Sequence, residues 1–172
     1  MYCTPAQLAD SDVRAQQLAL LFGIDQALLV ATVTGAPRDA WGPDEIALAD
    51  AALASMQAEL ERATGEADAR LARRGYTLPA DPVRFPVLVV WTRAIARYHL
   101  NAEREGDNAN VVDGRIERDY LDARQALDLI AAGKLSLGAG DPLAVPGEGA
   151  HAGAIRITSQ PRMFNRRTLG GF

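Results

Sequence analysis

Residues Pro43 to Arg74 read PDEIALADAALASMQAELERATGEADARLARR, a pattern that predicts one long helix around which the other elements pack. Proline suits the first turn of a helix, and Asp44 and Glu45 place negative charge at the positive end of the helix dipole. Gly75 is a natural stop, and Gly65 is a point where the helix could bend or break. The apolar residues recur at three-and-four spacing and make a single seam: Ile46, Ala49, Leu53, Met56, Leu60, Ala63, Ala67 and Leu71.

Shorter elements are expected before this long helix. Thr4 and Pro5 have the order of an N-cap and a first-turn proline, and the apolar residues that follow predict one or two short helices before Gly23. The stretch 24–33 is apolar and fits either a helix or a strand. The stretch 35–42 contains glycine and proline and is expected to be a loop.

Two more helices are expected after it. A connection with three prolines at 77–86 leads to a helix that begins near Pro86, and a polar loop at 101–114 leads to a last helix at about 115–132. The buried seams are expected to hold Leu88, Trp91, Ile95 and Tyr98 on the first, and Ile116, Tyr120, Ala123, Leu127 and Ile130 on the second. Another face of the first carries Arg93 and Arg97, and Arg104 follows in the polar loop. Either these arginines form ion pairs with the long helix or with a neighbouring subunit, or they are solvated.

The composition bounds the class of protein. A chain of 172 residues suits one domain, and its 48% hydrophobic content, rich in alanine and with only 6% aromatic residues, predicts a mainly α fold. The formal net charge of −4 argues against wrapping nucleic acid with the whole surface. Cys3 is the single cysteine, so no internal disulfide is expected. No apolar run reaches about 20 residues and the start lacks signal-peptide order, so a cytoplasmic protein is expected.

The last forty residues differ from the rest, because they hold eight of the fifteen glycines and three of the nine prolines. The sequence therefore predicts a helical domain at 1–133, a bundle of about four helices, and an extended arm at 134–172 that could carry a short strand near 155–158. From residue 151 the arm has arginines but no acidic side chain. Docking on a protein is favoured over DNA phosphates. The expected contact residues are Arg156, Arg162, Met163, Phe164, Arg166, Arg167, Leu169 and Phe172.

Catalytic, cofactor and metal sites are not expected. The sequence has no Walker A loop and no G-x-S-x-G elbow, and its two histidines, His99 and His151, have no partners at metal-ligand spacing. A calcium loop starting at Asp107 is excluded, because Ala109 and Val111 would stand where oxygen ligands are needed. The protein is therefore expected to act through binding, not as an enzyme.

Five segments, in their order and spacing, resemble the Mu gp36-like family of phage proteins. They are Met1–Leu8 (MYCTPAQL), Arg74–Pro79 (RGYTLP), Ala94–Leu100 (AIARYHL), Gly133–Gly138 (GKLSLG) and Pro161–Phe172 (PRMFNRRTLGGF). The resemblance spans the whole chain, although the stretches 9–14 and 35–42 depart from the family pattern.

This resemblance implies a structural virion protein without an active site, of the kind grouped with head-to-tail joining components. Such connectors assemble as a closed ring at the portal-tail junction, so the expected partners are copies of itself, the portal protein and tail or neck proteins. The expected location is the virion neck, after assembly in the host cytoplasm. DNA would pass nearby without specific binding. A tail-completion or terminator factor, and a packaging or regulatory protein that uses the basic arm on DNA, remain alternatives.

Overall fold

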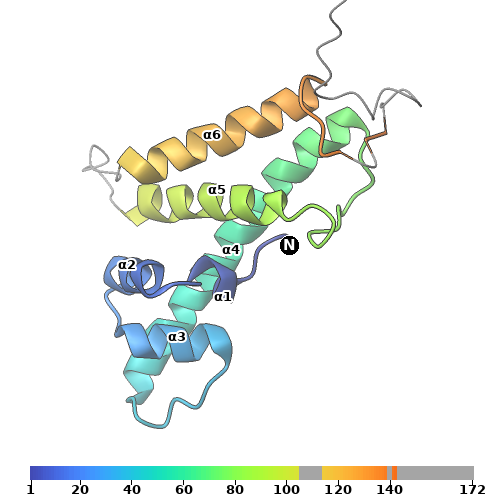
Figure 1. The fold of residues 1–172 in the computed structure, drawn as a ribbon. Helices are drawn as coiled ribbons and strands as arrows, with labels where there is room; N and C mark the ends of the chain where they lie inside the picture. Colours follow the sequence, from blue (N-terminus) through green and yellow to red (C-terminus); the bar gives the residue numbers. More distant parts are fainter. Residues whose placement is uncertain (105–113, 139–140, 143–172) are drawn as a thin grey trace, which may run out of the picture.

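The computed structural model describes residues 1–104, 114–138 and 141–142, and the regular structure within them is entirely helical. The expected mainly α class is confirmed, with three helices ahead of the long one. The helices are α1 (Pro5–Leu8), α2 (Asp12–Phe22), α3 (Gln26–Thr34), α4 (Pro43–Arg74), α5 (Val87–Arg104) and α6 (Gly114–Ala131). In Figure 1, α4 is the axis of the molecule: α5 and α6 run antiparallel across one part of it, and α1 to α3 gather around the other.

The long helix has the predicted bounds and the predicted seam. Its start is capped by the Glu45 carboxylate, which accepts a 2.8 Å hydrogen bond from the Gly42 N–H, and its end is Gly75 at φ 91°. Gly65 lies on the exposed side and does not interrupt the 32 residues, which extend for about 48 Å at the usual rise. Every residue of the predicted seam is buried except Ile46 and Leu53, which are half-buried.

Side-chain caps explain the short helices of the amino-terminal part. The hydroxyl of Thr4 accepts from the Gln7 N–H at 3.2 Å, and the Gln7 side chain accepts from the Thr4 N–H at 2.9 Å. These reciprocal bonds make the capping box that starts α1. The ambiguous stretch 24–33 belongs to a helix, because Asp25 caps the start of α3 by accepting from the Leu28 N–H at 3.0 Å.

The structure corrects two details of α5. The helix continues to Arg104, so the polar loop that was expected to begin at Asn101 starts later; the Asn101 amide donates to the Arg97 carbonyl at 2.7 Å within the helix. The buried face is also rotated, since Trp91 and Tyr98 are only half-buried. Buried polar side chains caused this error, because Thr92 and His99 lie in the core beside Leu88, Ile95 and Ala96. The predicted seam of α6 is confirmed, with Tyr120 half-buried at its edge.

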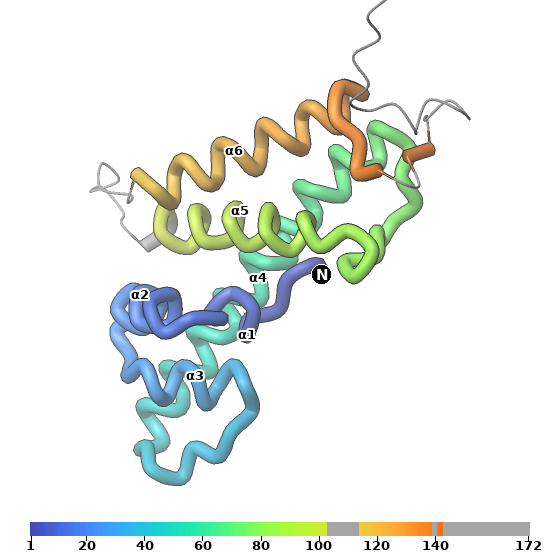
Figure 2. Tube along the Cα trace, in the orientation of Figure 1, coloured from blue at the N-terminus to red at the C-terminus, as the bar shows by residue number. Residues whose placement is uncertain are grey.

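The amino terminus is part of the core. Tyr2 and Cys3 are 3% and 0% exposed. Figure 2 shows the first residues leading from the N-terminus, near α4 and α5, to α1. The Tyr2 hydroxyl donates to the Asp68 carboxylate on α4 and accepts from the Ala80 N–H at 3.0 Å. Burial raises the pKa of Tyr2 to about 12. Tyr2 thus joins three separate segments through one side chain.

Within the described residues, no single helix has both the length and the hydropathy of a membrane span. Only α2 and α3 taken together reach those limits, and a bend of 106° separates them.

Replacement of Leu60 by alanine tests the packing on α4. Leu60 is 0% exposed, so the variant should lose about 2–5 kcal/mol of unfolding free energy, measured by urea denaturation followed by circular dichroism. The matched control is Leu48→Ala on the same helix, where the leucine is 59% exposed and the loss should be within about 0.5 kcal/mol. Equal losses for both variants would contradict the packing described above.

Candidate interaction surface

The residues that the sequence singled out as a docking site lie outside the described part of the chain. All eight belong to the segment 143–172, so the protein-docking role of this arm stays a prediction. The strand expected near 155–158 also lies outside the described residues, as does the stretch 105–113, where a calcium loop was excluded from the sequence. Other surfaces, which the sequence analysis did not single out, are defined by the structure.

A hollow that combines charged and aromatic side chains lies along the solvent-facing side of α5. A pocket of about 370 Å³ and a second of about 210 Å³ share Arg14, Arg97 and Asp119, so they form one groove between α2 and α6. We call it the α5 groove. It is lined by Val90, Trp91, Arg93, Ala94 and Arg97 of α5, Val13, Arg14 and Gln17 of α2, and Arg115, Asp119, Asp122 and Ala123 of α6, with Ser11 at one end.

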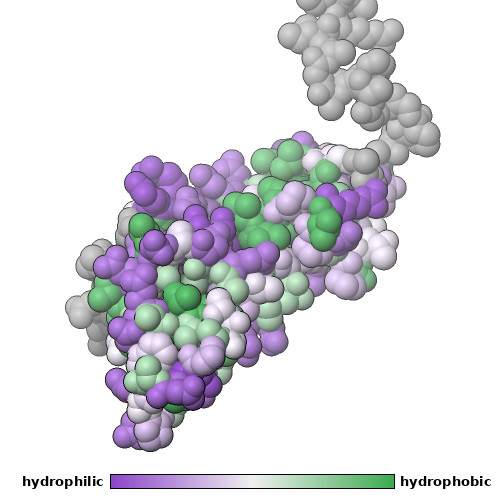
Figure 3. All heavy atoms as spheres, turned by 60° about the horizontal axis from the view of Figure 1, so that its bottom comes forward, coloured by the Kyte–Doolittle hydropathy of each residue, from purple (hydrophilic) through white to green (hydrophobic). Residues whose placement is uncertain are grey.

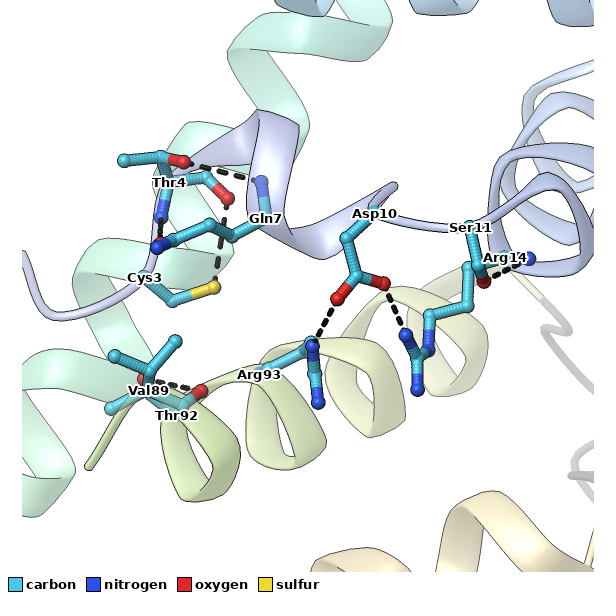
Figure 4. A network of polar contacts seen from close by, with 9 residues as sticks. All are labelled: Cys3, Thr4, Gln7, Asp10, Ser11, Arg14, Val89, Thr92 and Arg93. Carbon is cyan, nitrogen blue, oxygen red and sulfur yellow. Dashed lines mark hydrogen bonds and ion pairs between the residues drawn. The ribbon is translucent and has the colours of Figure 1, made fainter. Parts of the chain in front are cut away.

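Polar bonds hold α2 against α5. Asp10 lies directly before α2, and its carboxylate bridges Arg14 and Arg93, with 2.6 Å between Oδ2 and the Arg93 guanidinium (Figure 4). A second tie joins Arg97 to the Gln17 side-chain oxygen at 3.0 Å. The arginines of α5 therefore bond to the amino-terminal segment, which sequence reasoning missed. The Asp10–Arg14 spacing of four residues was the available signal.

Among the described residues, the floor of the α5 groove at Val90, its rim at Val13 and its α6 wall are exposed. Val13 and Val90 are 65% and 50% exposed. On the α6 wall, Asp119 and Asp122 form no hydrogen bond or ion pair with any described residue. Figure 3 shows such a mixture on one face of the molecule, where hydrophobic side chains stand among hydrophilic ones. Exposed apolar groups next to arginine and tryptophan are typical of protein-protein interfaces.

A buried polar cluster links α4 to α5. His99 and Glu59 are both 7% exposed, and His99 Nδ1 lies 3.1 Å from the Glu59 carboxylate. The other ring nitrogen lies 3.4 Å from Glu66. Tyr98 stacks on Tyr120 of α6 at 3.9 Å between ring centroids, and this pair covers one side of the cluster. Among the described residues no group of three potential ligands could hold a metal ion. The cluster joins α4 to α5 and lies against Tyr120 of α6.

The thiol of Cys3 is shielded. Its side chain is fully buried beneath α5, and burial raises the pKa of the thiol to about 11 from an ordinary value of 9.0. Thiolate chemistry at neutral pH is therefore suppressed.

Comparison with known families identifies the chain. Its sequence matches the family described as Bacteriophage Mu, Gp36 over residues 2–154, which is most of its length. The chain belongs to the Mu Gp36 family. No curated protein and no solved structure matches it.

The Mu Gp36 match confirms the resemblance inferred from the sequence. It includes the described helices and the GKLSLG segment, whereas the closing segment Pro161–Phe172 lies beyond it. The α5 groove, built from α2, α5 and α6, therefore lies within the part that defines the Mu Gp36 family.

The buried cluster of this Mu Gp36 family member can be tested with two glutamates on one helix. Glu59→Ala would leave His99 without its closest partner in the core, so we expect a loss of about 1–3 kcal/mol in unfolding free energy. Glu61 is exposed on the same helix, and Glu61→Ala should change stability by less than about 0.5 kcal/mol. Calorimetric unfolding of both variants measures the difference. Similar values would rule out a stabilising role for the cluster.

The shielding of Cys3 predicts slow labelling. At pH 8 a thiol pKa of about 11 leaves about a hundredfold less thiolate than the ordinary value does, and burial adds a steric barrier. A disulfide reagent should modify the native protein at least about a hundredfold more slowly than the urea-unfolded protein. A native rate near the unfolded one would show that the first residues leave the core readily.

Proposed function

We propose that this protein is a head-to-tail connector, a structural virion protein that assembles as a ring at the junction of portal and tail. It acts through assembly contacts and carries out no reaction. Its partners are copies of itself, the portal protein and a tail or neck protein. Placement at the head-tail junction and in a ring is part of this proposal.

Membership of the Mu Gp36 family is the observation that carries the proposal. The match over residues 2–154 makes this a phage-related protein. The described fold suits an assembly role, because the helices packed along α4 leave several separate surfaces that could meet neighbours. A tail-completion factor would use the same kind of body, and the position in purified particles separates the two roles.

A closed ring needs two different surfaces on each copy, because head-to-tail contacts join unlike patches. The α5 groove supplies the first. The second is the outer stripe of α4, whose residues face away from the core and are all exposed: Asp44, Leu48, Ala51, Ser55 and Ala58. The small side chains allow a neighbouring helix to approach closely, while Leu48, 59% exposed, and Asp44 offer an apolar and an acidic contact. We propose that this stripe enters the α5 groove of the next copy.

The charge of the chain is compatible with a DNA channel. At a net charge of −4, few fixed contacts to phosphate would form, so DNA could slide past without being held. The alternative, a protein that binds DNA, is favoured by a single feature, the four arginines of the arm. Salt-sensitive binding to duplex DNA that is lost on replacement of Arg162, Arg166 and Arg167 would support that alternative.

We expect rings in negative-stain images of the protein, either alone or when mixed with portal protein from the same phage or prophage, with a matching mass by light scattering. Val90→Asp should abolish the rings, because it places a charge on the floor of the α5 groove. Leu48→Asp should have the same effect from the other side of the contact.

Leu20→Asp is the matched control. Leu20 is 74% exposed on α2, outside both proposed surfaces, so this variant should still form rings. A wild-type protein that stays monomeric and ignores the portal would refute the connector role. Rings that survive both Val90→Asp and Leu48→Asp would instead refute only the proposed contact.

A further inference from the structure

The described chain ends at a fixed point. Asp141 is buried, and its carboxylate accepts two hydrogen bonds from the Arg74 guanidinium, at 3.0 and 2.9 Å. Pro142 lies beside Gly75, and the Leu137 N–H donates to the Tyr76 hydroxyl at 3.0 Å. The chain therefore starts its last thirty residues next to the carboxyl-terminal ends of α4 and α6.

A shallow groove lies close to this point on the outer face of α6. It has a volume of about 440 Å³, and we call it the α6 groove. Leu121, Leu129 and Ala132 provide its apolar surface, and Leu121 is 54% exposed. Its lining is completed by Arg124, Gln125, Asp128 and Lys134. Because Ala132 and Lys134 directly follow α6, one end of the groove is adjacent to the segment that leads to Asp141.

The segment beyond Pro142 has matching chemistry. It contains four arginines and one glutamate, a net charge of +3. Since the whole chain has a net charge of −4, residues 1–142 carry a net charge of −7. Its last ten residues include four large apolar side chains, Met163, Phe164, Leu169 and Phe172. On the face of α6 that carries Leu121, Glu117 and Asp128 are exposed, and Glu117 has no bonding partner among the described residues. An apolar groove with acidic groups beside it on an acidic body fits a basic, aromatic peptide.

We propose that residues 163–172 dock in the α6 groove of their own chain in the free subunit. Met163 lies 21 residues beyond Pro142, and the root-mean-square span of a random coil of that length is about 25 Å. The whole of α6 extends for about 27 Å, so the groove is within reach. A short tether of this kind gives an effective concentration of the order of millimolar, which favours the chain's own groove over a neighbour's in dilute solution.

The α6 groove has both basic and acidic side chains. The bonds that these side chains already form indicate which of them can still contact the arginines of the docked segment. Arg124 donates to the Tyr120 hydroxyl at 2.9 Å and lies over that ring, so its guanidinium is turned toward the chain's own aromatic group. Asp128 bonds to Arg70 at 2.8 Å but is 62% exposed at its side chain, which leaves an oxygen accessible to a further guanidinium. Lys134 is the other positive group of the groove. Apolar contacts with Leu121 and Leu129 therefore supply the main attraction, and the acidic groups orient the arginines.

Limited trypsin digestion of the full chain, without portal, tests the docking. Trypsin cleaves after arginine, so docking should protect the bonds after Arg166 and Arg167. We expect Leu121→Asp to accelerate cleavage there about tenfold, the effect of losing one buried leucine contact. The matched control is Leu20→Asp on α2, where the leucine is 74% exposed and lines neither groove, so this variant should be cleaved at the wild-type rate. Mass spectrometry of the released peptides gives the rates, and circular dichroism verifies that both variants are folded.

A second variant changes the peptide instead of the groove. Phe172→Ser should also accelerate cleavage, and combining it with Leu121→Asp should add little, because both remove the same contact. Equal cleavage of wild type and Leu121→Asp would overturn the docking. Protection that increases with protein concentration would overturn the intramolecular contact in favour of a neighbouring copy. Because no portal or ring is needed, this result is independent of the connector proposal.

Discussion

The structure depends on the need to cover both halves of a helix about 48 Å long. The buried side of α4 is apolar along most of its length, from Ala49 and Met56 to Ala67 and Leu71. Almost every turn therefore needs an apolar neighbour. No other helix among the described residues is long enough to cover it alone. Helices α5 and α6 cover one part and α1 to α3 the other, which makes an elongated body in place of a symmetric bundle (Figure 1).

Polar side chains fix how these two sets of helices fit the axis. Apolar contacts alone tolerate sliding, whereas His99 between Glu59 and Glu66 satisfies its bonds in one register of α5 on α4. Tyr2 does the same for the amino terminus, since its hydroxyl has partners on α4 and in the connection before α5. Removing any of these partners would leave a buried polar group unsatisfied, which costs more than the bond itself contributes.

The sequence was most informative where local signals and burial coincide. Pro43, the alanine and leucine seam and Gly75 give the bounds of α4 directly, and the family resemblance follows from short segments in order. The sequence did not predict which face of α5 is buried, because Thr92 and His99 are polar and polar residues usually lie at the surface. In the structure their polar atoms are satisfied in the core, Thr92 by the Leu88 carbonyl and His99 by Glu59. The α5 groove was equally hidden, since it combines α2, α5 and α6, whose juxtaposition depends on long-range bonds such as Asp10 to Arg93.

The way in which α2 is attached bears on the proposed assembly. Apolar packing of α2 onto α5 would have covered Val90 and Ala94 and closed the floor of the groove. Instead, Asp10 and Gln17 hold α2 at the edge through Arg93 and Arg97, so the helix is fixed while the floor stays open. The Asp10–Arg93 tie is an ion pair and the Gln17–Arg97 tie a hydrogen bond to a neutral amide, and both are accessible to solvent in the free subunit. An incoming helix would bury them further and strengthen them, which would couple the position of α2 to occupancy of the groove.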